Sequence, residues 1–370
     1  MSSTLARGTV RTGTRVLADG WALLRHGTVT AVGTGEAPPA DRVVTGAHVV
    51  PGFVDLHCHG GAGASFGGTG DAAVAAARTA AALHRAHGTT TLLASLVTRP
   101  VDELAATLAA LADLVADDVL AGVHLEGPWL SPDHRGAHDA ALLRAPEPGD
   151  VDRLLGTGVV RAVTLAPELP GGLDAVRRVS GHGAVAAVGH TGADEDTARA
   201  AADAGARLAT HLFNAMPPVH HRRPGPVLAL LADERVVVEL IADGVHLHPL
   251  VLAHAARTAG PARTALVTDA MAAAGAPDGT YRLGGLATVV TDGVARLADG
   301  GAIAGSTLTL DRALRFAVTA AGIALDDALA AVTAVPAALL GRGDRGHLEP
   351  GATGGAVVLD EDLKPLHVVH

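Results

Sequence analysis

The sequence predicts an α/β fold in which a (β/α)8 barrel is joined to a small β-sandwich domain. Three observations predict it. Short apolar runs alternate with Ala-rich segments of helical length through the middle of the chain, and eight such runs are present. Both ends of the chain read instead as short strands separated by Gly. An open doubly wound sheet would usually need fewer strands, and the Gly60–Gly63 stretch lacks the spacing of a dinucleotide fingerprint.

The two ends of the chain are predicted to form one small β domain. Neither end has enough strands to bury a sheet face alone, so the termini are expected to pair with each other. The predicted division is residues 1–50 plus 345–370 for this domain and residues 51–344 for the metal-dependent barrel.

The barrel strands and helices follow from the alternation of apolar runs and Ala-rich segments. The eight predicted strands are 52–56, 89–97, 119–125, 159–166, 184–189, 206–212, 236–242 and 264–268. Predicted helices include 71–87, 101–115, 194–204, 249–259 and 308–320. After the eighth strand, residues 275–305 carry Gly-rich hairpin-like segments, and a long insertion there is more often a lid or pocket wall than an idle connection.

The composition of the chain limits which binding partners and which cellular compartment we expect for the protein. The net charge of −10 provides no basic face for nucleic acid, although a small anionic substrate needs only a few local cations. A single cysteine, Cys58, excludes an internal disulfide and fits a reducing cytoplasm. Neither a targeting segment nor a membrane-spanning run is recognisable, so we expect a cytoplasmic protein without a membrane partner.

Polar residues gather at the carboxyl ends of the predicted strands, which share one face in a barrel. Each signal is weak alone, because a single His is more often a hydrogen-bonded core residue and an Asp there could be a helix cap. Together, imidazoles and carboxylates suit Zn, Fe, Mn or Co, and argue against calcium or an iron–sulfur centre. The candidate residues of this rim are His57, His59, Glu126, His190, His211 and Asp269.

Lysine is nearly absent from the chain, and this absence restricts the metal chemistry. Lys364 is the only lysine, so a carboxylated lysine in the barrel cannot bridge two metals. Glu126 is therefore the better candidate for a bridging acid, ahead of Glu168, which lies beyond a proline. His124, Glu168 and His182 are expected to be structural or supporting residues.

Several motifs resemble those of the N-acetylglucosamine-6-phosphate deacetylases of the amidohydrolase superfamily, over nearly the whole chain. The most specific are Arg135-Gly136-Ala137-His138, Gly189-His190-Thr191, His211-Leu212-Phe213-Asn214-Ala215-Met216, Ala242-Asp243-Gly244-Val245-His246 and Thr268-Asp269-Ala270-Met271. The resemblance implies Glu126, His190 and His211 as common metal ligands and Asp269 as the general acid/base. It also implies His138 as a further catalytic residue on the substrate side. The implied contacts to the sugar phosphate are Ala137, His138, Asn214, Ala215, Arg222, His246 and Ile303.

The resemblance also implies the reaction and the assembly. Metal-activated water would hydrolyse the N-acetyl group of N-acetyl-D-glucosamine 6-phosphate, giving D-glucosamine 6-phosphate and acetate. With His57 and His59 present, the chain has ligands for one or two divalent metals (Zn, Fe, Mn or Co) per subunit. Because the family's arginine reaches a neighbouring subunit, Arg222 implies a homodimer.

Three other interpretations remain. A cyclic amidase or deaminase of the same superfamily would lack the Asn214-Ala215-Met216 and Arg222 features, and cyclic amidases often need the absent lysine. A deacetylase for the galactosamine 6-phosphate epimer differs only in pocket details. A non-catalytic sugar-phosphate sensor would not need an intact ligand set with Asp269, and chelator-sensitive acetate release separates the enzyme from the sensor.

Overall fold

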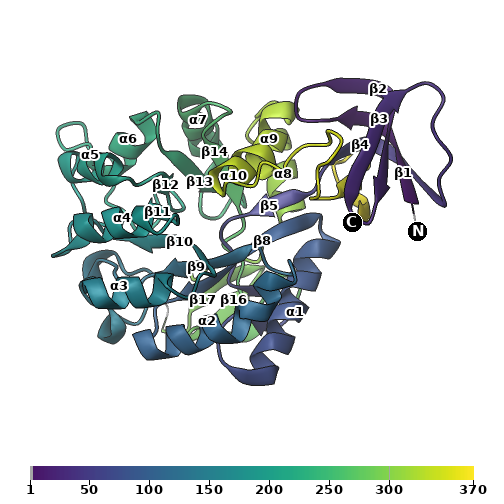
Figure 1. Cartoon of the computed structure of the whole chain (residues 1–370). Helices are drawn as coiled ribbons and strands as arrows, with labels where there is room; N and C mark the ends of the chain where they lie inside the picture. Colours follow the sequence, from purple (N-terminus) through teal and green to yellow (C-terminus); the bar gives the residue numbers. More distant parts are fainter. Residues whose placement is uncertain (1–2, 300) are drawn as a thin grey trace.

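Strands from both ends of the chain form a single six-stranded sheet. The computed structural model describes residues 3–299 and 301–370. Residues 1 and 2 of the predicted β domain and residue 300 of the predicted lid segment lie outside the described residues. The strands are β1 (Ser3–Arg11), β2 (Val16–Arg25), β3 (Thr28–Thr34), β4 (Arg42–Pro51), β18 (Ala356–Leu359) and β19 (Pro365–Val369), in the order β19-β18-β4-β1-β2-β3. The C-terminal strand β18 pairs antiparallel with β4, as the pairing of the termini requires, and the two ends of the chain lie close together in Figure 1. Hydrophobic clusters, one around Ala6 and Val10 and one around Leu5 and Trp21, pack this sheet.

Eight parallel strands form the barrel, which confirms the predicted fold class. They are β5 (Phe53–Asp55), β8 (Thr89–Val97), β9 (Gly122–Glu126), β10 (Val160–Leu165), β11 (Val185–Val188), β12 (Leu208–Ala209), β13 (Val237–Ile241) and β14 (Thr264–Val267), paired in sequence order. Each lies within or overlaps a predicted apolar run. The ring closes beyond the strand ends, where Cys58 and Ala270 make a parallel bridge and the Asp269 N–H donates to the His57 carbonyl oxygen at 2.8 Å.

Helices cover the outer face of the barrel (Figure 1). They are α1 (Gly70–Ala86), α2 (Val101–Ala116), α3 (Pro148–Leu155), α4 (Gly172–Gly181), α5 (Glu195–Ala204), α6 (Gly225–Ala232), α7 (Pro249–Ala259), α8 (Leu310–Thr319), α9 (Leu325–Val332) and α10 (Ala334–Leu339). The main core lies between these helices and the strands and is built mostly from Ala, Val and Leu. Such small aliphatic side chains let helices approach the sheet closely, which compensates for the scarcity of aromatic residues.

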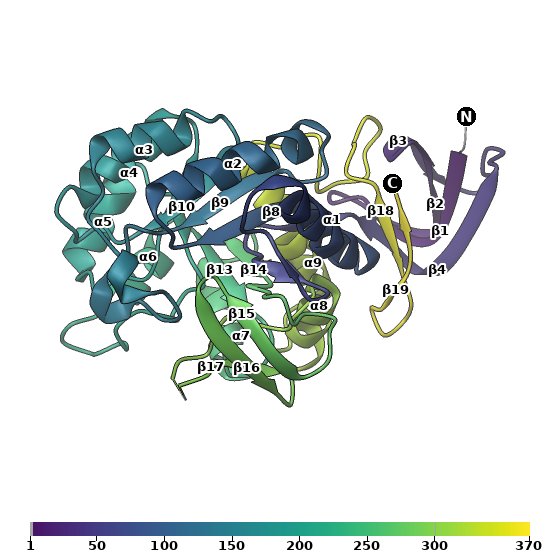
Figure 2. The ribbon, with the colours of Figure 1, turned by 90° about the horizontal axis from the view of Figure 1, so that it is seen from below.

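A small antiparallel sheet follows β14, inside the predicted lid segment 275–305. It consists of β15 (Gly279–Leu283), β16 (Leu286–Thr291) and β17 (Val294–Leu297), and it projects from the barrel as a separate lobe (Figure 2). Leu283, Val290 and Ala304 pack with Met271 near the end of β14, so the small sheet is fixed beside the strand ends. The remaining elements are short: β6 (Gly60–Gly61), β7 (Ala64–Ser65) and two 3₁₀ turns at Pro132–His134 and Ala140–Leu142.

Among the residues that the structure describes, no helix combines the length and the apolar character needed to cross a membrane. The boundaries 50/51 and 344/345 between the two predicted domains stay a prediction.

Candidate metal centre and active site

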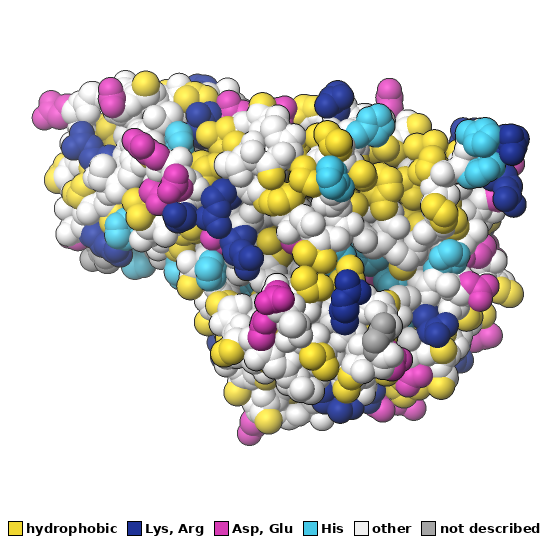
Figure 3. Space-filling view, turned by 180° about the vertical axis from the view of Figure 1, so that it is seen from behind, with side chains coloured by type: hydrophobic (Ala, Val, Ile, Leu, Met, Phe, Trp, Pro, Cys, Tyr) yellow, Lys and Arg dark blue, Asp and Glu magenta, His cyan; other side chains and the backbone are white. Residues whose placement is uncertain are grey.

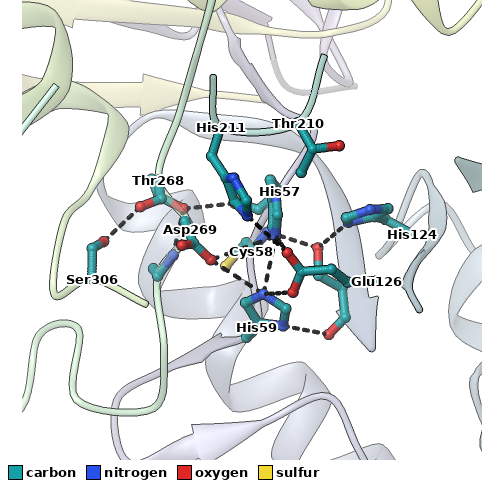
Figure 4. A network of polar contacts seen from close by, with 12 residues as sticks. His57, Cys58, His59, His124, Glu126, Thr210, His211, Thr268, Asp269 and Ser306 are labelled. Carbon is teal, nitrogen blue, oxygen red and sulfur yellow. Dashed lines mark hydrogen bonds and ion pairs between the residues drawn. The ribbon is translucent and has the colours of Figure 1, made fainter. Parts of the chain in front are cut away.

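Side chains from five different strand ends meet inside the mouth of the barrel, and Figure 4 shows His57, His59, Glu126, His211 and Asp269 of this cluster. His57 and His59 follow β5, and Glu126 is the last residue of β9. His190, His211 and Asp269 each lie two residues beyond the end of β11, β12 and β14, respectively. All six side chains are buried. Because parallel strands end on one face of the barrel, residues separated by more than 200 positions in sequence become neighbours.

Glu126 lies at the centre of the cluster. Its Oε1 is 3.0 Å from Nε2 of both His190 and His211, and 3.5 Å from Nε2 of His57. Its Oε2 is 3.3 Å from Nε2 of His59 and 3.2 Å from Nε2 of His138. One carboxylate thus faces imidazoles on two sides, an arrangement that lets it contact two cations at once.

Asp269 closes the cluster on the side of β14. Its Oδ1 is 3.2 Å from Nε2 of His59 and 3.5 Å from Nε2 of His57. The backbone around it is tied to the first barrel strand, because Thr268 donates its hydroxyl to the Asp55 carboxylate at 2.6 Å. Asp55 also accepts the backbone N–H of His57 at 3.2 Å. These bonds fix Asp269 relative to the two histidines.

Three of these residues adopt a left-handed backbone conformation, which residues other than Gly rarely adopt. The φ angles are +48° at His190, +27° at His211 and +47° at Asp269. Such conformations cost on the order of 1–3 kcal/mol each and occur where the surrounding structure imposes them, often at functional sites. The left-handed turn at each strand end directs the side chain into the barrel mouth instead of along the strand.

The hydrogen bonds of His57 and His59 show that the pair suits a cation. Nδ1 of His57 lies 3.2 Å from the Glu239 carboxylate, and Nδ1 of His59 lies 3.2 Å from the carbonyl oxygen of Ser95, so both Nδ1 atoms carry the proton. Both Nε2 atoms then present lone pairs, yet they lie only 3.0 Å apart. Two lone pairs at this distance repel each other unless a proton or a metal ion lies between them.

His190 repeats this pattern on the other side of Glu126. Nδ1 of His190 donates to the carbonyl oxygen of His134 at 3.0 Å, which leaves Nε2 as the acceptor. That Nε2 is 3.1 Å from Nε2 of His211. The donor set, imidazole nitrogens with carboxylate oxygens, is the one that Zn, Fe, Mn and Co prefer, so the residues fit a divalent metal.

His138 differs from the other histidines of the cluster. Its Nδ1 accepts the backbone N–H of Thr98 at 3.3 Å and lies 2.8 Å from the Thr98 hydroxyl. Because a backbone N–H can only donate, the ring proton is on Nε2, which points at Glu126. His138 therefore presents a hydrogen-bond donor, not a lone pair, to the site.

The charges of the cluster attract a cation. Burial raises the pKa of Glu126, but the neighbouring His57 and His190 outweigh burial and keep it well below its usual range. For Asp269, burial acts in the same way and is outweighed by His57 and His59, so its pKa is also lowered. Burial lowers the pKa of His59, yet its bonds to Asp269 and Glu126 raise it to about 9. Two ionised carboxylates that can hold a proton on an imidazole will equally favour a divalent cation.

Cys58 points away from this cluster, as expected for a residue between two inward-facing neighbours in an extended segment. Its Sγ is 3.2 Å from Nε2 of His84 on α1, and that nitrogen also contacts the Gly60 carbonyl oxygen at 2.9 Å. Asp55, Cys58 and His84 lie close enough to form a second group of potential ligands. These three residues are buried and hydrogen-bonded within the protein, so we assign them a structural role.

A cavity of about 340 Å³ opens above the cluster. Six of the seven predicted substrate contacts line it, namely Ala137, His138, Asn214, Ala215, His246 and Ile303. Leu283 of the small sheet forms part of its wall, in line with the predicted role of the 275–305 segment. Arg222 does not line this cavity, and its side chain is exposed.

The surroundings of His246 at this cavity favour its protonated form. Its Nδ1 lies 2.6 Å from Oδ2 of Asp243. Burial lowers the pKa of His246, but the hydrogen bond and the charge of Asp243 outweigh it and raise the pKa. In its protonated form, His246 offers Nε2–H, which this bond leaves free, to a phosphate oxygen.

The residues expected to be structural lie outside the ligand set. His124 bonds Ser95 at 2.9 Å and Thr164 at 2.8 Å inside the barrel. Glu168 accepts the Gly192 N–H at 2.6 Å and so fixes the loop after His190. His182 pairs with Asp152 on the surface.

Sequence reasoning missed Glu239, Asp55 and Thr98. Glu239 is a charged residue inside the apolar run 236–242, and this interruption was the available signal. Nothing in the sequence indicates that Thr98 meets His138, because 40 residues separate them.

Comparisons with known proteins agree with this geometry. The sequence profile of the amidohydrolase family matches residues 48–369. An N-acetylgalactosamine-6-phosphate deacetylase of Escherichia coli O157:H7 is 39% identical over 322 residues, 85% of this chain and 84% of that protein. An N-acetylglucosamine-6-phosphate deacetylase of Bacillus subtilis (strain 168) is 35% identical over 81% of this chain and 78% of that protein.

A solved structure extends the likeness to the whole chain. It is an aspartate-to-alanine mutant of the N-acetyl-D-glucosamine-6-phosphate deacetylase of Mycobacterium smegmatis, in complex with N-acetyl-D-glucosamine-6-phosphate. It is 46% identical, with a TM-score of 0.95, and the match covers 100% of this chain and 98% of that one. The chain therefore belongs to the amidohydrolase family and, within it, to the family of the N-acetylglucosamine-6-phosphate deacetylases.

Proposed function

We propose that this chain hydrolyses the N-acetyl group of N-acetyl-D-glucosamine 6-phosphate, releasing acetate and D-glucosamine 6-phosphate in amino-sugar catabolism. The observation that carries the proposal is the position of Glu126, which contacts five histidines and lines the same cavity as Asp269. The likeness to a complex with this sugar phosphate names the substrate.

The proposed metal ligands form two sets that share Glu126. His190 and His211 with Glu126 would hold one divalent ion, and His57 and His59 with Glu126 would hold a second. A divalent ion bound there supplies Lewis acidity, which lowers the pKa of water from 15.7 to about 7. The affinity of each ligand set for metal determines whether one or both sets are occupied. Zn, Fe, Mn and Co all suit these donor atoms.

Asp269 is the proposed general acid/base. In the part of the chain that the structure describes, the side-chain contacts of Asp269 go to Oδ1, which leaves Oδ2 for a proton. Both oxygens of Glu126, by contrast, are engaged by histidines. Asp269 would take the proton of the attacking water and return it to the departing amine nitrogen.

His138 is the proposed donor to the carbonyl oxygen of the acetyl group. Its Nε2–H points into the site, and Thr98 fixes that tautomer. A preorganised donor of this kind stabilises the negative charge that develops on the oxygen, an effect worth about 3–4 kcal/mol.

The phosphate end is proposed to lie near Asn214, Ala215 and His246, with Arg222 of a second subunit completing it. Arg222 has no acidic partner among the ion pairs of the described residues. Exposed apolar side chains occur on the same part of the chain, at Val219, Leu228, Val245, Leu250 and Val251. Hydrophobic side chains gather on the rear face of the molecule, in the part where α6 and α7 lie (Figure 3). This surface supports a homodimer as the proposed assembly.

Turnover of both epimers by the metal-loaded protein tests the proposal. We expect kcat/KM for N-acetylglucosamine 6-phosphate to exceed that for the galactosamine epimer, and unphosphorylated N-acetylglucosamine to be a poor substrate. Higher kcat/KM for the galactosamine epimer would reassign the substrate, and binding without acetate release would indicate a sensor. A cytoplasmic location is likewise a proposal, and cell fractionation tests it.

A further inference from the structure

Glu239 is a buried carboxylate that the proposed chemistry leaves without a role. It lies in β13, a strand that supplies none of the proposed metal ligands, and its side chain is 1% exposed. A carboxylate removed from water is costly unless hydrogen bonds satisfy it. Its neighbours should therefore show what it does.

One oxygen of Glu239 joins the two halves of the metal centre. Oε2 lies 3.2 Å from Nδ1 of His57 and accepts the backbone N–H of His211 at 3.1 Å. The backbone carbonyl oxygen of Glu239 accepts the N–H of Leu212 at 2.9 Å. The carboxylate thus holds a ring on one side of Glu126 and a strained backbone, with φ of +27° at His211, on the other.

His57 differs from its neighbours in the kind of acceptor that it meets. Nδ1 of His59 donates to the carbonyl oxygen of Ser95, and Nδ1 of His190 donates to that of His134. His57 instead donates to a carboxylate. A carboxylate fixes the tautomer with a free Nε2 and makes that nitrogen a stronger ligand than a carbonyl oxygen does.

We propose that Glu239 is a positioning residue that sets the affinity of the His57/His59 side of the centre for its ion. Through this affinity it decides whether the subunit holds one metal or two at a given metal concentration. The inference rests on the metal ligands of the proposed function. Glu239 does not line the cavity; it acts on the His57/His59 side through the His57 ring, and its bond to the His211 N–H is a separate backbone contact.

Metal binding, not turnover, tests this role. Glu239→Leu removes the acceptor, whereas Glu239→Gln retains an oxygen acceptor and removes the charge. Metal content after equilibrium dialysis and competition titration with a chelator give the number of ions and their Kd values. We expect Glu239→Leu to raise the Kd of the ion held by His57 and His59 on the order of 10–100-fold, and Glu239→Gln to raise it less.

A double-mutant cycle separates action through His57 from general loosening of the site. In a His57→Asn background, Glu239→Leu should change the Kd much less than in the wild type, because the ring that it positions is absent and only its bond to the His211 N–H remains. Glu168→Gln is the matched control, since Glu168 also holds a loop beside the centre but contacts no ligand side chain through its carboxylate. It should keep the wild-type ion number and Kd values.

The outcomes are distinct. Wild-type Kd values in both Glu239 variants overturn the proposal, and so does an equal loss in the wild-type and His57→Asn backgrounds. If Glu239→Leu does not fold, Glu239→Gln decides the question against the same controls. A wild-type protein that binds no divalent metal contradicts the proposed centre itself, which distinguishes failure of the proposed function from failure of the role of Glu239.

Discussion

Replacing Asp269 with Asn removes the proposed acid/base while leaving the shape of the site. Asp269 is 8% exposed, and Asn has nearly the same size, so packing should persist. Proton transfer by a positioned side chain contributes about 10²–10⁴-fold to rate. Because the same carboxylate is proposed to accept the proton and to return it, we expect kcat to fall about 10³-fold, which corresponds to about 4 kcal/mol.

The assay must separate lost proton transfer from lost metal, because Oδ1 of Asp269 lies 3.2 Å from Nε2 of His59. Acetate release should therefore be measured at saturating substrate and at saturating metal, with metal content determined on the same sample. Asp269→Glu is a useful companion, since it keeps the charge and displaces the carboxylate. An Asp269→Asn protein with kcat within tenfold of the wild type would refute the acid/base assignment.

Three further predictions follow from the geometry. His138→Phe should lower kcat about 10²–10³-fold with unchanged metal content, because His138 presents a donor and not a lone pair; loss of metal would instead make it a ligand. Asp243→Asn should lower the pKa of His246. KM for the sugar phosphate, measured as a function of pH, should therefore begin to rise at a lower pH than in the wild type. If the two pH profiles of KM coincide, the His246 imidazolium does not bind the phosphate. Arg222→Ala should raise KM for the phosphorylated sugar with little change in kcat, and an unchanged KM would remove Arg222 from the phosphate site.

The barrel could be predicted from sequence because each of its strands is buried on both faces and reads as an apolar run. The convergence of His57, Glu126 and Asp269 then follows from the geometry of parallel strands, without knowledge of any side-chain contact. Strand lengths were less predictable. The run 206–212 is a strand only at Leu208–Ala209, because the chain turns before the left-handed residue at His211.

The contacts that define roles within the site could not be predicted. Whether an imidazole presents a lone pair or a proton depends on what its other nitrogen meets, and for His138 that partner is Thr98, on another strand end. Glu239 carried a signal as a charge in an apolar strand, but its partner His57 is 182 positions away. Only the closed ring of strands brings such pairs together.

The central claim is that the histidine–carboxylate cluster binds a divalent metal on which acetate release depends. Its most direct test is acetate release from N-acetylglucosamine 6-phosphate, measured together with metal content as a chelator removes the metal stepwise. We expect activity to fall in proportion to the metal lost and to return when Zn, Fe, Mn or Co is added back. Full turnover by the metal-free protein would contradict the account.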